Sequence, residues 1–225
     1  MAEELGKIER PKVEDFRKGR KLYFVPLIYT GKEPPADYAE KFNKYWEQVE
    51  SQIANLELKL GQVKRIFHEL IAEGGESGLT MLKLLSPRSY EIVRSRVEMG
   101  GQLEATEEDD VLTEFMDWNR CLAIGLRSPT VAEKVYEAYR EAYKKRNEQI
   151  TSRLNEALKE DEIGILLMAE DHHVQFPSDI QIIYVAPPAL DEIKRWLRDW
   201  ESRRGAIPEE ETKEQEPKED KGQTT

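Results

Sequence analysis

The chain has 225 residues, and its 34 lysine and arginine residues against 45 aspartate and glutamate residues leave a net charge of −11. This negative charge argues against nucleic acid as a partner, and the absence of any run of about 18 apolar residues argues against a membrane-spanning segment. The start of the chain does not resemble a signal peptide and there is one cysteine, so the sequence predicts a cytoplasmic protein without an internal disulfide.

The composition divides the chain into three parts. Residues 21–205 are numerous and apolar enough to form a single domain with a sizeable core. Residues 1–20 are rich in charge around Pro11 and are expected to form a charged arm. The last twenty residues, 206–225, hold seven acids and three lysines, with no large apolar residue after Ile207. Such a segment cannot bury enough apolar surface to offset the entropy of ordering, so we expect a disordered acidic tail.

The spacing of apolar residues predicts strands that alternate with helices. Residues 35–60 repeat them at intervals of four and three, which is typical of a helix with one buried face. Residues 163–169 are continuously apolar, which is typical of a strand covered on both faces. The fold class is therefore α/β, a mostly parallel sheet flanked by long helices in three layers, because connections of this length between strands require crossovers. In chain order we expect a strand at 21–29, a helix at 35–60, a strand at 63–72, short helices at 79–85 and 90–97, long helices at 106–124 and 130–159, strands at 163–169 and 180–186, and a helix at 190–203.

The long helix expected at 130–159 carries an arginine on its apolar face. Arg146 falls on the line formed by Tyr139, Tyr143 and Ile150. A buried guanidinium is unfavourable unless a counter-charge and hydrogen bonds accompany it. Arg146 therefore has two interpretations: it holds an anionic group in a polar pocket, or it belongs to a structural ion pair.

Other polar residues lie at the ends of the predicted strands, where open α/β sheets place their ligand sites. Tyr29 ends the first strand, Glu69 lies on the second, and His172 and His173 follow the third. A carboxylate, an arginine and a histidine at one edge are typical of acid–base chemistry, or of a divalent-metal site with Glu69 and His172 as ligands. In the structural alternative, Glu69 is the ion-pair partner of Arg146 and the histidines are ordinary loop residues.

An acidic run from Glu107 to Asp110 occupies the first turn of the helix expected at 106–124. Acidic side chains in the first turn of a helix interact favourably with the helix dipole, and Thr106 is a suitable cap. We therefore expect this run to be a solvated helix N-terminus rather than a metal cluster.

The stretch RNEQITSRLNEALKEDEIGILLMAEDHHV runs from Arg146 through a helix and a strand to Ala169-x-x-His172. It resembles the arginine helix, strand and Gly-x-x-His motif of the TraB/Tiki and ChaN/erythromycin-esterase-like superfamily, with Ala169 in place of the glycine. Glu69, which ends the sequence IFHE, is similar to the strand-borne glutamate of that group. The first Gly-x-x-His motif of the superfamily would fall on residues 26–29, where both of its defining residues are missing.

This resemblance implies an α/β core with metal-dependent hydrolysis or, in some branches, haem or other ligand handling. The chain departs from the pattern at Tyr29, which stands in place of the first motif histidine. A tyrosine there is suited to donate a hydrogen bond to an oxyanion.

Two classes of function follow. In the first, the protein is a hydrolase-like enzyme in which Glu69 and His172 are bases or metal ligands, Arg146 orients an anionic substrate and Tyr29 polarises it. In the second, it is a ligand-binding or protein-interaction scaffold that has lost the superfamily's chemistry. A homo-oligomer is compatible with both classes. No sequence feature identifies the substrate, the partner, or a cofactor other than the divalent metal.

Overall fold

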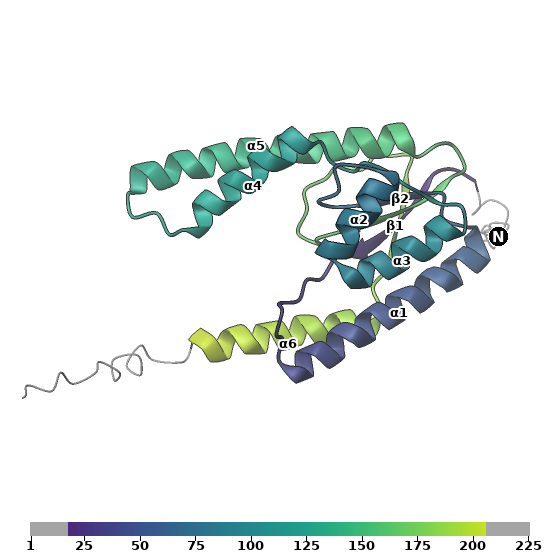
Figure 1. Ribbon diagram of the computed structural model, residues 1–225, viewed down its shortest axis with the longest axis horizontal. Coiled ribbons are helices and arrows are strands. Elements are labelled where there is room, and N and C mark those ends of the chain that lie inside the picture. Colours follow the sequence, from purple (N-terminus) through teal and green to yellow (C-terminus); the bar gives the residue numbers. More distant parts are fainter. Residues whose placement is uncertain (1–17, 206–225) are drawn as a thin grey trace, which may run out of the picture.

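Five parallel strands form one sheet in the computed structural model, which describes residues 18–205 (Figure 1). The strands pair in the order β3-β2-β4-β1-β5, and each neighbouring pair is parallel. The α/β class and the parallel sheet that we predicted from the crossover lengths are therefore confirmed. The strands are β1 (Lys21–Pro26), β2 (Arg65–His68), β3 (Gln102–Leu103), β4 (Ile163–Met168) and β5 (Gln181–Tyr184).

Helices cover both faces of the sheet. Alternate side chains of β1 point to opposite faces, so that Tyr23 belongs to one hydrophobic core and Leu22 to the other. The first core includes residues of α1, α2, α3 and α6, whereas the second includes residues of α5. These three layers agree with the prediction. The helices are α1 (Ala36–Leu60), α2 (Gly75–Leu85), α3 (Pro87–Glu98), α4 (Asp109–Ala123), α5 (Pro129–Ala157) and α6 (Pro188–Gly205).

The buried strands follow from local sequence, but their ends do not all match the expectation. All six residues of β4 are buried, as the continuous apolar run predicts. β1 ends at Pro26 instead of at residue 29, and its pairing with β5 stops at Phe24 and Tyr184, because proline has no N–H to extend the ladder. β3 was not expected, since two residues are too few to show an alternating pattern.

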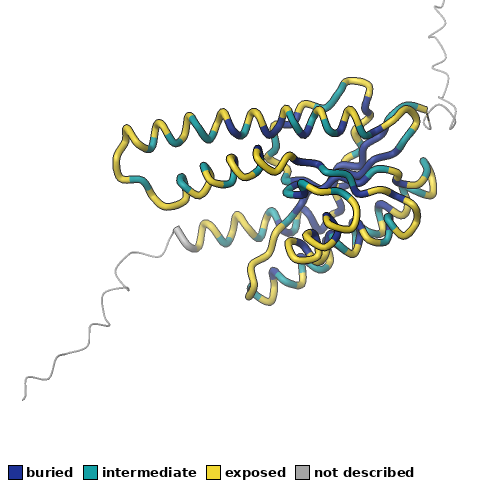
Figure 2. Tube along the Cα trace, turned by 45° about the horizontal axis from the view of Figure 1, so that its top comes forward, coloured by how far each residue is buried: buried dark blue, intermediate teal, exposed yellow. Residues whose placement is uncertain are grey.

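α4 and α5 form a helical hairpin that extends past the sheet (Figure 1). The C-terminal half of α5 packs Ile150 and Leu154 against the second core, and the first buried residue of this helix is Ala142. Much of the surface of the hairpin's free end is therefore exposed (Figure 2). The hairpin is held to the domain at one end only.

The chain ends are described only in part. Residues 1–17 and 206–225 lie outside the described residues, and with them most of the expected arm and the whole expected acidic tail. Arg20 pairs with Asp179 at 2.6 Å and donates to the carbonyl oxygen of Leu158 at 3.1 Å. Between residues 18 and 205, no helix is both long and apolar enough to cross a membrane.

Candidate functional site

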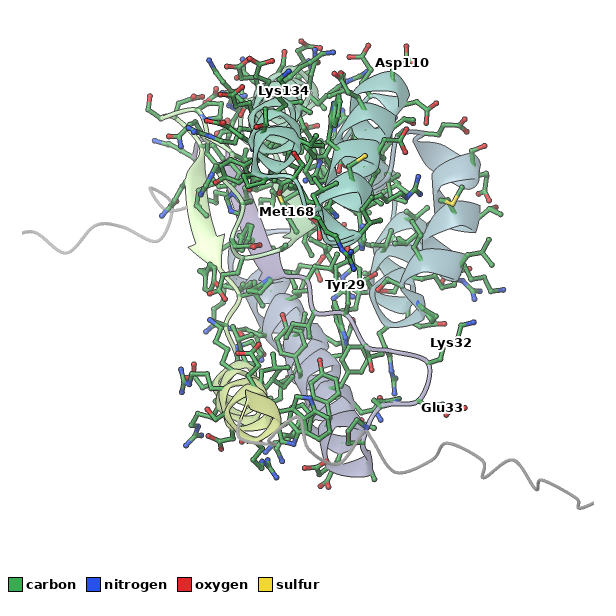
Figure 3. All side chains as sticks on the ribbon, turned by 90° about the vertical axis from the view of Figure 1, so that its left-hand side faces the viewer. Tyr29, Lys32, Glu33, Asp110, Lys134 and Met168 are labelled. Atoms are coloured by element: carbon green, nitrogen blue, oxygen red, sulfur yellow. The ribbon has the colours of Figure 1, made fainter. Side chains whose placement is uncertain are left out.

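Four polar residues from separate parts of the chain meet at the carboxyl edge of the sheet. Tyr29 follows β1, Glu69 follows β2, Glu107 follows β3, and Arg146 lies on α5. We call these four residues the strand-end cluster. Figure 3 shows Tyr29 between the α4–α5 hairpin and the pair formed by α1 and α6. The sequence analysis predicted three of the four members.

The strongest contact in the cluster joins Arg146 to Glu107. The guanidinium Nε donates to Glu107 Oε2 at 2.7 Å and Nη2 donates to Oε1 at 2.5 Å. Arg146 is 5% exposed and Glu107 is 1% exposed, so water screens this bidentate pair very little. The ring of Phe115 lies under the guanidinium, with its centroid 4.7 Å from Arg146 Cζ. The structural alternative named Glu69 as the ion-pair partner of Arg146, but the main partner is Glu107, and Glu69 Oε2 lies 3.6 Å from Nη2.

Glu69 is a buried carboxyl without a short ion pair. Its Oε1 accepts a hydrogen bond from the Tyr29 hydroxyl at 2.9 Å, and its Oε2 lies 3.6 Å from Arg146 Nη2. Burial raises the pKa of Glu69 above its ordinary value, although the Tyr29 hydrogen bond and the Arg146 charge act in the opposite direction. Burial and the neighbouring Glu69 also raise the pKa of the Tyr29 hydroxyl, which therefore stays protonated. Glu69 thus has the character of a tuned acid–base group.

The backbone beside Glu69 is strained. Leu70 has a φ of 67°, a conformation that costs a bulky residue about 1–3 kcal/mol. Its N–H donates to Glu107 Oε1 at 2.7 Å, so the carboxylate that holds Arg146 also holds this conformation. Strain of this kind is concentrated at functional sites. No glycine or turn motif in the sequence indicated it.

The structure corrects the interpretation of the acidic run that begins at Glu107. The helix α4 starts at Asp109, and Glu107 is buried instead of solvated. Thr106 is fully buried and accepts a hydrogen bond from the His68 N–H at 2.9 Å, so it does not cap the helix. The reason is that β3 pairs with β2 and so places Thr106 and Glu107 against the edge of the sheet just before α4 begins.

The two adjacent histidines do not contact the strand-end cluster. His172 packs between Phe24 and Phe176, with ring centroids 5.0 and 5.4 Å away, and its Nδ1 accepts from the Val174 N–H at 3.2 Å. Burial lowers the pKa of His172. His173 is exposed, and its ring lies edge-on to Tyr143. No interaction of His172 with Glu69 is found over residues 18–205.

The donor set for a metal ion is not assembled in the described part of the chain. No group of three or more histidine, cysteine, aspartate or glutamate side chains within residues 18–205 is arranged to hold a metal ion. The oxygens of Glu69 instead face the Tyr29 hydroxyl and Arg146. A divalent metal at Glu69 and His172 stays a prediction.

A small pocket of about 290 Å³ lies beside the cluster, and Tyr29 is part of its wall. Its lining is mainly apolar, with Leu27 and Ile28 from the loop after β1 and Ile193 from α6. At its polar end Lys194 pairs with Glu170 at 2.6 Å. Ligand sites commonly combine an apolar lining with a few polar groups in this way. Tyr29 joins the pocket to the buried carboxyl of Glu69.

Comparisons of this chain with protein-family models, with curated proteins and with solved structures give no match, so its function has to be argued from the residues of the strand-end cluster and the adjoining pocket.

Proposed function

We propose that the protein is a hydrolase of small esters, with Glu69 as the general base and the pocket beside Tyr29 as the acyl-binding site. The observation that supports this most directly is the state of Glu69. Its carboxyl is 5% exposed and has a raised pKa, while the nearby arginine is already paired with Glu107. A proton-transfer group requires a pKa closer to neutral than that of an exposed glutamate, and burial shifts the pKa of Glu69 in that direction. The resemblance to the TraB/erythromycin-esterase-like proteins is consistent with hydrolysis.

Each member of the cluster has a role in this proposal. Ionised Glu69 takes a proton from a water molecule as that water attacks the ester carbonyl carbon. Once Glu69 is protonated, the Tyr29 hydroxyl exchanges its hydrogen bond to that carboxyl for one to the oxyanion that forms. When the intermediate collapses, protonated Glu69 returns the proton to the departing alkoxide. Arg146, fixed by Glu107, is a positioning residue that supports the ionised form of Glu69. We assign no step to His172.

The proposal has a defined dependence on pH. Glu69 must be ionised to accept a proton, and its pKa is raised by burial. We therefore expect kcat/KM to increase with pH through a pKa above the ordinary value of a glutamate, and to level off once Glu69 is ionised. A profile that falls over the same range would contradict the role of Glu69 as a base.

Hydrolysis of p-nitrophenyl butyrate tests the proposal directly. We expect the wild-type protein to release p-nitrophenol, and Glu69→Gln to lower kcat/KM by about 10²- to 10⁴-fold, as loss of a general base does. Glu73→Gln is the matched control, because Glu73 is exposed in the same loop. An inactive wild-type protein, or activity equal in Glu69→Gln and Glu73→Gln, would reject the hydrolase.

A second candidate function is a non-catalytic scaffold. Arg146 and Glu107 satisfy each other's charge and fasten the α4–α5 hairpin to the sheet edge, as a structural anchor would. In that case the hairpin serves partner binding and the strand-end cluster serves stability. The same assay separates the two functions, since a scaffold shows no turnover dependent on Glu69. For either function we propose a cytoplasmic protein, in line with the single cysteine.

A further inference from the structure

An open groove of about 1250 Å³ runs along α5 on the outside of the molecule. It is lined by one face of α5 and by the loop at residues 171–175 that follows β4. Tyr136 and Tyr143 line it, and Tyr136 is 54% exposed. Figure 2 shows exposed positions recurring along the length of this helix. The groove lies outside the strand-end cluster and has no role in the chemistry proposed above.

Four charged residues of this groove form a pattern whose signs are inverted when it is read in the opposite direction. Glu137, Arg140, Glu141 and Lys144 all line it, with spacings of three, one and three residues. At about 100° per residue these positions fall on one face of the helix. Read forwards the signs are minus, plus, minus, plus, and read backwards each sign is inverted. Two such helices placed antiparallel therefore bring Arg140 beside Glu141 of the other copy and Glu137 beside Lys144.

These groups are poorly paired within one chain. Among the described residues, Glu137, Arg140 and Glu141 have no ion-pair or hydrogen-bond partner for their side chains, and Lys144 reaches Glu148 only at 3.8 Å. The groove also contains Asn147, which is 6% exposed and whose Oδ1 is buried without a hydrogen-bond partner. This acceptor is enclosed within the chain, so the groups that a partner can reach are the exposed charges of the groove and not Asn147.

We propose that this groove binds α5 of a second copy of the chain, antiparallel and across a two-fold axis beside Arg140 and Glu141. A two-fold interface places the same patch on both subunits, so the patch must be complementary to itself. The inverted charge pattern meets that requirement, whereas an unrelated partner would not need it.

Sedimentation velocity over a range of concentrations tests this dimer. We expect the wild-type protein to dimerise, and Arg140→Glu and Glu141→Arg each to weaken association by about tenfold or more, because each sets like charges opposite each other. A mixture of the two single variants should form heterodimers, since the carboxylate introduced by Arg140→Glu then faces the guanidinium introduced by Glu141→Arg. The double variant with both changes in one chain should dimerise like the wild type. Arg120→Glu, an exposed change on α4, is the matched control and should have no effect.

Rescue in the mixture separates this interface from any other. A wild-type protein that stays monomeric at every concentration would overturn the proposal. So would a dimer whose stability is the same in both single variants, because the contact would then lie elsewhere, for example along the edge of β5. Failure of the mixture to form heterodimers would show that Arg140 and Glu141 do not face each other. Thermal melts of each variant confirm that the fold is retained.

Discussion

Replacing Glu107 with alanine is expected to lower the free energy of unfolding by about 3–5 kcal/mol, because the change leaves Arg146 buried without its main counter-charge. Arg146 loses both short hydrogen bonds, and its remaining acidic neighbour, Glu69, lies 3.6 Å away. The N–H of Leu70 also loses its acceptor, so the strained backbone at that residue is no longer held. The strand-end cluster thus links the sheet edge, α5 and the start of α4.

Urea unfolding of Glu107→Ala and Glu108→Ala measures this effect. Glu108 is the next residue and is exposed, so its removal should change stability by less than about 0.5 kcal/mol. Replacing the pair together, with Arg146→Met and Glu107→Leu, should recover much of the loss, because the uncompensated charge is removed. Equal stability of the two single variants would show that the cluster is not a buried ion pair in solution.

Acidification is expected to destabilise the protein by about 3 kcal/mol between pH 6.5 and 4 through His68 alone. His68 is 1% exposed, and burial lowers its pKa from 6.5 to about 4. Its Nδ1 lies 2.6 Å from the carbonyl oxygen of Glu69, and its Nε2 lies 3.0 Å from the Ser89 hydroxyl. Within this pH window the unfolded chain binds a proton that the folded protein does not. The stabilisation is therefore complete above pH 6.5 and is lost as the pH falls towards 4.

The slope of unfolding free energy against pH identifies this group. His68→Asn should show a smaller slope than the wild type between pH 6.5 and 4, whatever its absolute stability, and the exposed His173→Asn should keep the wild-type slope. Glu69 contributes to this slope with the opposite sign, because a raised carboxyl pKa makes stability fall as the pH rises. The contribution of Glu69 is present in the wild type and in both variants, so it cancels when their slopes are compared. An unchanged slope in His68→Asn would mean that His68 is not buried as a neutral ring.

The sequence was sufficient for the fold class because the signals that specify it are local and periodic. The apolar run at 163–169 predicted the buried strand β4, and the intervals of four and three at 35–60 predicted α1. β3 escaped prediction because a strand of two residues has no period. The sequence analysis placed the end of the first strand at residue 29 instead of Pro26, because the residues up to 29 remain aromatic or branched after the strand pairing has stopped.

For the candidate site, the sequence by itself determined that Arg146 needs a buried counter-charge and that Tyr29 and Glu69 lie at the same sheet edge. Only the tertiary structure decided that Glu107 supplies that charge. The run of acids around Glu107 has the composition of a solvated helix start, and its burial depends on the pairing of β3 with β2, residues distant in the chain. The strained conformation of Leu70 is likewise held by a hydrogen bond to Glu107, 37 residues away. Local composition determines which residues tend to be buried, whereas the choice between two possible ion-pair partners depends on distances that exist only once the sheet has formed.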